Sequence, residues 1–148
     1  MTEITILIVV LVVAGGIGLF VQRRDGRARP TEAPVTDTRR TELLTAAGIG
    51  TAGPAVLHFS AEWCGPCAAV RRVVSGVTAD LADRARPPRD IEIDIDAEPA
   101  LARELNVLSL PTTFVFDTEG RERFRISGVP KTADLRSALD PLTVADQG

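Results

Sequence analysis

The stretch Trp63-Cys64-Gly65-Pro66-Cys67 decides how this chain is interpreted, because it holds both of the chain's cysteines. It directly follows a short apolar run, Ala55–Phe59, that is typical of a buried strand. A strand-to-helix turn at this point places the first sulfur at a helix N-terminus, where unpaired N–H groups and the macrodipole favour a thiolate. Since a thiolate is the species that attacks disulfides, the segment predicts thiol–disulfide chemistry.

Two other uses of a C-x-x-C segment are less well supported. A zinc site normally needs four ligands, and the chain offers two cysteines and a single histidine, so no metal site is expected. A purely structural disulfide across so short a loop removes little chain entropy and stabilises weakly. A redox-active Cys64–Cys67 disulfide is therefore the favoured interpretation.

With Ala61-Glu62 before it, the segment resembles the active site of the thioredoxin family. The likeness continues in the alternating run Ile91–Asp96, in Leu110-Pro111-Thr112, which resembles the loop with the family's cis-proline, and in a final hairpin. It covers roughly residues 41 to 142. The resemblance implies a thioredoxin-like α/β fold, with a mixed central sheet flanked by helices.

The resemblance also assigns roles to the site residues. Cys64 is expected to attack a substrate disulfide and form a mixed disulfide, which Cys67 then resolves. The dipeptide between the cysteines resembles the reducing members of the family rather than the oxidising ones. The residues expected to bind or support the substrate are Trp63, Gly65, Pro66, Leu110 and Pro111.

One position departs from the family's pattern. Six residues before the first cysteine the family usually has a buried acid, and this chain has His58, its only histidine. A facing lysine of the family is replaced by Glu92. One hypothesis is that neutral His58 accepts the Cys67 proton while Glu92 orients the ring. The alternative, that His58 is a half-buried strand residue without a catalytic part, stays open.

The first 21 residues differ in character from the rest. The run Ile4–Val21 is apolar apart from Thr5, and its 18 residues make about 27 Å of helix, close to the roughly 30 Å hydrocarbon core. Glu3 and the lack of a small-x-small cleavage site disfavour a cleaved signal peptide. Residues 4–21 are therefore expected to form a transmembrane anchor in the lipid bilayer, and the chain to be a single-pass plasma-membrane protein.

The segment after this run predicts the orientation. Four arginines lie between residues 22 and 29, and the positive-inside rule places that side in the cytoplasm. The redox domain is then cytoplasmic, although the extracytoplasmic orientation stays open. Residues 22–40, basic and proline-containing, are expected to form a linker, and residues 41–148 the thioredoxin-like domain.

Periodicity predicts the main elements of that domain. Residues 55–60 form a strand, and Val70, Val73, Val74, Val77 and Leu81 mark one apolar stripe of the following helix. The alternation over 91–96 predicts a second strand. Asp96 is expected to cap a helix that has Pro99 in its first turn, and a last helix is expected to stop near Pro141.

The charge balance and the motifs limit the kinds of molecule with which this chain is expected to interact. Beyond residue 40 the chain carries eleven basic and sixteen acidic side chains, which argues against nucleic acid. Neither a nicotinamide nor a flavin motif is present, so no cofactor is expected, and electrons must come from a thioredoxin reductase or another dithiol donor. The leading function is a membrane-tethered oxidoreductase that reduces disulfide-containing proteins. The alternatives are an outward-facing reductase of the cytochrome-maturation type and a non-catalytic assembly module with the same fold.

Overall fold

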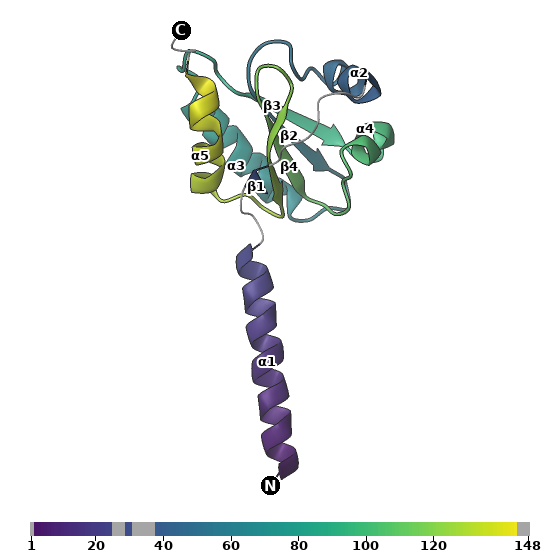
Figure 1. The fold of residues 1–148 in the computed structure, drawn as a ribbon, viewed down its shortest axis with the longest axis vertical. Helices are drawn as coiled ribbons and strands as arrows, with labels where there is room; N and C mark the ends of the chain where they lie inside the picture. Colours follow the sequence, from purple (N-terminus) through teal and green to yellow (C-terminus); the bar gives the residue numbers. More distant parts are fainter. Residues whose placement is uncertain (1, 25–28, 31–37, 145–148) are drawn as a thin grey trace.

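The structure, a computed structural model, describes residues 2–24, 29–30 and 38–144 of the 148-residue chain. Figure 1 shows an α/β domain and, outside it, the single rod of the first helix. The elements follow in the order α1 (Thr2–Arg24), β1 (Arg29–Pro30), α2 (Thr38–Ala46), β2 (Ala55–Ser60), α3 (Cys67–Asp80), β3 (Arg89–Asp94), α4 (Pro99–Glu104), β4 (Thr112–Phe116), β5 (Glu122–Ser127) and α5 (Thr132–Thr143).

The strands form one mixed sheet in the order β1-β5-β4-β2-β3. β2 pairs in parallel with β3 and antiparallel with β4, so it lies at the centre of the four longer strands. β5 pairs antiparallel with β4, and the two residues of β1 extend the sheet beyond β5. The mixed sheet flanked by helices that the resemblance implies is confirmed.

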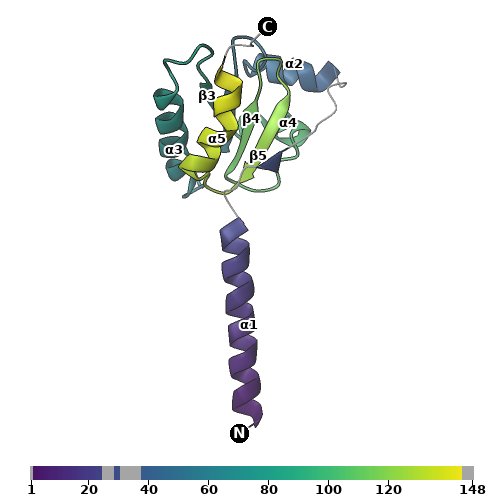
Figure 2. The same ribbon diagram turned by 60° about the vertical axis from the view of Figure 1, so that its left-hand side comes forward.

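Two layers of helices cover the sheet. α3 and α5 pack against one face, where Val70 and Leu135 join Val56 in a buried cluster. α2 and α4 pack against the other face, around Leu57 and Phe114. Figures 1 and 2 show the two helix pairs on opposite sides of the strands. Because side chains alternate along a strand, His58 lies on the same face as Val56, under α3.

The elements predicted from periodicity are present, with differences in their bounds. The strand predicted over 91–96 spans Arg89–Asp94. The last helix, predicted to stop near Pro141, runs two residues past it to Thr143, with the proline inside its last turn. β1 and the start of α2 lie within residues 22–40, which were predicted to be a linker. The rest of that predicted linker, residues 25–28 and 31–37, lies outside the described residues.

The prediction of a membrane location is wrong. In the ranges that the structure describes, no helix combines the length and the apolar character that crossing a membrane requires. The prediction depended only on the apolar character of the run 4–21 and on a helical length close to the roughly 30 Å of the hydrocarbon core. The plasma-membrane location is contradicted, and the anchor at 4–21 and the lipid bilayer partner are not supported.

Candidate active site

The two cysteines are bonded to each other at the start of α3. Cys64 and Cys67 form a disulfide, with their Cα atoms 5.5 Å apart. The turn before them is closed by the backbone N–H of Cys64, which donates to the carbonyl of Ala61 at 3.1 Å. Cys64 is half-buried, whereas Cys67 is only 1% exposed. One sulfur of the pair therefore lies near solvent and the other lies in the protein interior.

The helix that follows gives the pair its electrostatic setting. α3 begins at Cys67 with Pro66 as its N-cap, and no side chain in the described part of the chain caps it. The positive end of a 14-residue helix thus lies beside both sulfurs. This placement favours the thiolate form of a reduced cysteine there.

Strand pairing brings the proline loop to the same edge of the sheet. Phe59 near the end of β2 is the register partner of Thr112 at the start of β4, so the turn after β2 and the loop before β4 lie side by side. The Leu110–Pro111 peptide bond in that loop is cis, as the resemblance predicts. The Pro111 carbonyl accepts a hydrogen bond from the backbone N–H of Gly128 at 2.9 Å.

Two exposed apolar side chains lie in the loops at this end of the sheet, one in the cysteine turn and one before the cis-proline. Trp63 is 70% exposed, and its indole Nε1–H donates to Asp96 Oδ2 at 3.2 Å. Leu108, in the loop that leads to the cis-proline, is 86% exposed. This end of the sheet therefore offers a partly apolar surface next to the disulfide.

His58 is buried in the central strand, but its partner is not the predicted one. The side chain of His58 is 2% exposed, and Nε2 lies 3.0 Å from Oδ1 of Asp90 on β3. Nδ1 has no hydrogen-bond partner within the described ranges. Glu92, although it is the register partner of His58, instead accepts two hydrogen bonds from Arg71 Nε, at 2.7 and 2.9 Å.

Asp90 rather than Glu92 pairs with His58 because of an arginine on α3. Arg71 extends from the helix over the edge of the sheet and binds the Glu92 carboxylate with its guanidinium. The hydrogen bond from Arg71 holds the pKa of Glu92 below its ordinary value. The predicted His58–Glu92 pair is therefore not formed, because Glu92 is already paired and Asp90 reaches the imidazole.

Sequence reasoning missed three residues at this site: Arg71, Asp90 and Asp96. Asp90 had a detectable signal, since it precedes Glu92 by two residues in an alternating strand and so lies on the same face. Arg71 and Asp96 had none, because their contacts with Glu92 and Trp63 join segments more than twenty residues apart.

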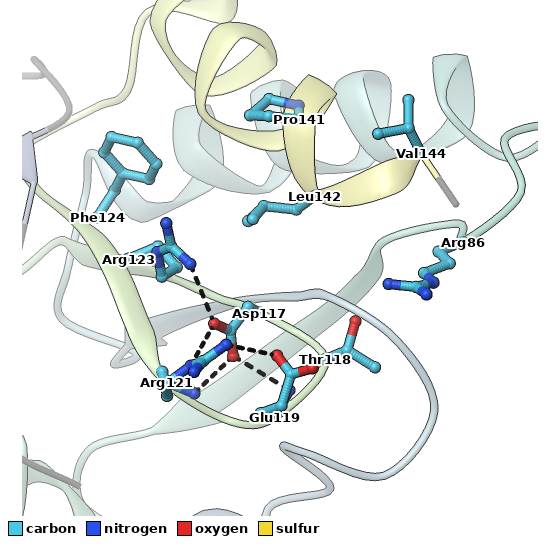
Figure 3. A pocket seen from close by; sticks show the side chains of 10 residues that line it. All are labelled: Arg86, Asp117, Thr118, Glu119, Arg121, Arg123, Phe124, Pro141, Leu142 and Val144. Carbon is cyan, nitrogen blue, oxygen red and sulfur yellow. Dashed lines mark hydrogen bonds and ion pairs between the residues drawn. The ribbon is translucent and has the colours of Figure 1, made fainter. Parts of the chain in front are cut away.

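A separate pocket lies at the opposite end of β4, away from the cysteines. Figure 3 shows the Asp117 carboxylate between the guanidinium groups of Arg121 and Arg123, with α5 residues above it. Asp117 also accepts the backbone N–H groups of Glu119 and Arg121. These contacts close the β4–β5 turn. The pocket is lined by Arg86, Asp117, Thr118, Glu119, Arg121, Arg123, Phe124, Pro141, Leu142 and Val144.

A bonded C-x-x-C pair at the start of a helix, beside a cis-proline loop at one edge of a mixed sheet, defines a class: the thiol–disulfide oxidoreductases of thioredoxin type. The family model described as thioredoxin matches residues 41–141. The chain belongs to the thioredoxin family.

Individual relatives agree with this assignment. The thioredoxin of Mycolicibacterium smegmatis is 36% identical over 113 residues, which cover 76% of this chain and 95% of that protein. Thioredoxin 1 of Synechococcus elongatus is 30% identical over 73% of this chain and 94% of its own length. With the cysteine pair present, these similarities identify the chain as a thiol–disulfide oxidoreductase. The family also suggests disulfide-containing substrates and a reductase as electron donor.

Solved structures show the same fold at lower identity. A crystal structure of chloroplastic thioredoxin z superposes with a TM-score of 0.55 at 21% identity, covering 72% of this chain and 89% of that one. The solution structure of the oxidised thioredoxin from Plasmodium falciparum gives a TM-score of 0.55 at 19% identity, covering 70% and 92%.

Proposed function

We propose that this chain reduces protein disulfides, with Cys64 as the attacking thiolate and Cys67 as the resolving thiol. The observation that carries the proposal is the unequal burial of the two bonded sulfurs: Cys64 is half-buried at the sheet edge, and Cys67 is 1% exposed. A substrate disulfide has access to the first sulfur only. The Gly65-Pro66 dipeptide, which resembles that of the reducing members, supports the reductive direction.

The reaction transfers two electrons from the dithiol to the substrate. The Cys64 thiolate attacks one substrate sulfur, forms a mixed disulfide and releases the other substrate sulfur as a thiolate. Cys67 then loses its proton and attacks Cys64 Sγ, which expels the second substrate thiolate and leaves the Cys64–Cys67 disulfide. A thioredoxin reductase or another dithiol donor returns two electrons and two protons to the pair.

The surroundings of Cys67 support His58 as the group that takes its proton. Cys67 Sγ lies 3.8 Å from the carbonyl oxygen of Phe59, the residue next to His58 on β2. His58 lies on the face that α3 covers, and Nδ1 is buried without a partner among the described residues. A neutral imidazole in this place acts as a general base.

The substrate surface in this proposal is the apolar edge around the disulfide. Trp63 packs beside the extended substrate segment, and the backbone of Leu110, before Pro111, pairs with it in the manner of an added strand. The half-buried position of Cys64 between these groups directs the substrate sulfur to it.

Trapping separates the two cysteine roles. In the Cys67→Ser variant we expect a stable mixed disulfide with a substrate protein, because no thiol remains to resolve it, and gel electrophoresis without reductant detects the adduct. The Cys64→Ser variant is expected to trap nothing and to lose all disulfide reductase activity. Full reductase activity of Cys64→Ser would overturn the proposal, whereas full complementation in cells by this catalytically inactive variant would favour the non-catalytic assembly module.

A further inference from the structure

We propose that Asp90 is a positioning residue, which holds the His58 ring with its proton on Nε2 and leaves Nδ1 as the lone pair that accepts the Cys67 proton. The inference rests on the proposed function and names a carboxylate for a role that the sequence alone gave to Glu92. Its basis is the pairing of His58 Nε2 with Asp90 Oδ1 at 3.0 Å and the unpartnered, buried Nδ1 on the same ring.

The tautomer follows from the hydrogen-bonding capacity of the ring. A neutral imidazole carries one donor nitrogen and one acceptor nitrogen, and a carboxylate accepts only. The nitrogen beside Asp90 must therefore be the donor, and Nδ1 the acceptor. Leaving a buried N–H without a partner costs a full desolvation penalty, which further disfavours a proton on Nδ1.

The buried Nδ1 lies on the face of the sheet that α3 covers. Across the sheet, the register partner of His58 on β4 is Thr113, whose Oγ1 also lacks a partner within the described ranges. Above this face lies the first turn of α3, which begins with the buried Cys67. The thiol of Cys67 is thus the acidic group in the first turn of the helix that covers His58.

The charged groups that face His58 are few and mostly paired. From β3 come Asp90 and Glu92, and from α3 come Cys67 and Arg71. Arg71 and Glu92 neutralise each other through the contact of Arg71 Nη2 with Glu92 Oε1 at 2.7 Å. Asp90 therefore supplies the negative charge that stabilises the imidazolium once the proton has moved.

The proton and electron pairs balance in the resolving step. The Cys67 S–H bond breaks, its proton binds Nδ1, and the sulfur's electron pair forms the new bond to Cys64 Sγ. The bond from Cys64 to the substrate breaks, and the departing substrate thiolate takes the proton from the imidazolium. His58 and Asp90 end the step as they began it.

A two-phase assay tests the role of Asp90. One equivalent of an aromatic disulfide with a coloured thiolate product is mixed with the reduced full-length chain. The first phase of colour reports attack by Cys64, and the second reports resolution by Cys67. We expect Asp90→Asn to slow the second phase by about tenfold, since its amide neither enforces the tautomer nor stabilises the cation, and to leave the first phase unchanged.

Two further variants control this result. Asp90→Glu keeps a carboxylate and is expected to recover most of the second-phase rate. Asp80→Asn removes an exposed acid that is paired with Arg136 at the other end of α3, and both phases should match the unmodified chain. A second phase in Asp90→Asn within twofold of the unmodified rate, or a Glu variant as slow as Asn, would overturn the inference.

Nitrogen NMR of the imidazole gives an independent readout, because His58 is the only histidine. We expect the neutral ring to carry its proton on Nε2 in the reduced chain, to lose this preference in Asp90→Asn, and to keep it in Glu92→Gln. A proton on Nδ1 in the unmodified chain contradicts the inference. If the first phase itself persists in Cys64→Ser, the proposed function fails, whereas a normal first phase with an unaffected Asp90→Asn variant rejects the positioning role alone.

Discussion

At the scale of single residues, Asp117 illustrates how this chain holds a buried charge. Its side chain is 5% exposed, and burial by itself raises the pKa of the carboxyl. The hydrogen bonds from the Arg121 side chain and backbone and from Arg123 more than compensate, so the pKa lies below its ordinary value. The carboxylate is stable inside the turn because four donors replace its water.

Replacing Asp117 with Asn tests this account. An amide cannot accept all four donors, so we expect the free energy of unfolding at neutral pH to fall by about 2 kcal/mol in urea titrations followed by circular dichroism. Because the folded pKa is depressed, the contribution is complete above the unfolded value near 3.8 and is lost as pH falls through the folded value. The two proteins should therefore converge at the lowest pH. Glu119→Gln, at an exposed partner of Arg121, serves as control and should change stability little.

Single residues also show which parts of the site could be predicted from the sequence and which could not. The cysteine pair and the proline loop were recognisable because their residue types and order carry the chemistry. The partner of His58 was not, because two acids on one face of β3 compete for it and an arginine from α3 decides the outcome. Competition among side chains from three elements leaves no pattern in any one of them.

At the scale of elements, α3 is the helix that carries the site, and it contains a correctable weakness. Gly76 lies in its interior on the exposed side, and a Cβ there meets no described atom within 4 Å. By contrast, Gly120 in the β4–β5 turn has φ +76, and a Cβ there meets Gly50 Cα at 3.5 Å. The two glycines differ in whether the backbone requires them.

Replacing Gly76 and Gly120 with alanine should therefore change the stability of the protein in opposite directions. We expect Gly76→Ala to raise the free energy of unfolding by about 0.5–1 kcal/mol, because alanine loses less backbone entropy in a helix. Gly120→Ala should lower it by about 1–2 kcal/mol, since a left-handed conformation strains a residue with a Cβ. Thermal unfolding followed by circular dichroism compares the pair, and a loss of stability in Gly76→Ala would show that α3 needs the glycine.

Elements with a clear period were predictable, and those without one were not. The apolar stripe of α3 lies in the observed helix apart from Leu81, its C-cap, and the alternation identified β3, although the observed strand begins and ends two residues before the predicted range 91–96. β1 has two residues, too few to show a period, and it exists because β5 offers an edge with which to pair. The end of α5 depends on how well its last turn tolerates Pro141, which the proline alone does not specify.

At the scale of the whole molecule, one ion-pair network joins segments that are far apart in the chain. Glu122 on β5 is 1% exposed at its side chain and binds Arg40 of α2 at 2.8 Å and Arg125 at 3.0 Å. Arg40 also donates to the carbonyl of Glu104 at the end of α4. No local pattern predicts such contacts, and residue 40 was in fact assigned to the linker.

Removing the arginine should loosen α2 without unfolding the domain. In Arg40→Met, Glu122 keeps Arg125 as a partner, so we expect amide hydrogens of α2 to exchange about fivefold faster while those of α3 stay unchanged. Hydrogen exchange measured by mass spectrometry reports both helices. Arg84→Met, at an exposed pair with Asp140, is the control and should leave both rates alone. Unchanged exchange in α2 would mean that apolar packing alone holds it.

The exposed indole beside the disulfide has a practical consequence for optical work. The chain has one tryptophan and no tyrosine, so nearly all of its near-ultraviolet absorbance and emission comes from Trp63. That side chain is already 70% in solvent in the folded protein. Its emission therefore reports poorly on loss of the core, but it responds directly to whatever covers the sulfur next to it. Intrinsic fluorescence of this protein is a docking signal, with the fluorophore supplied by the chain itself.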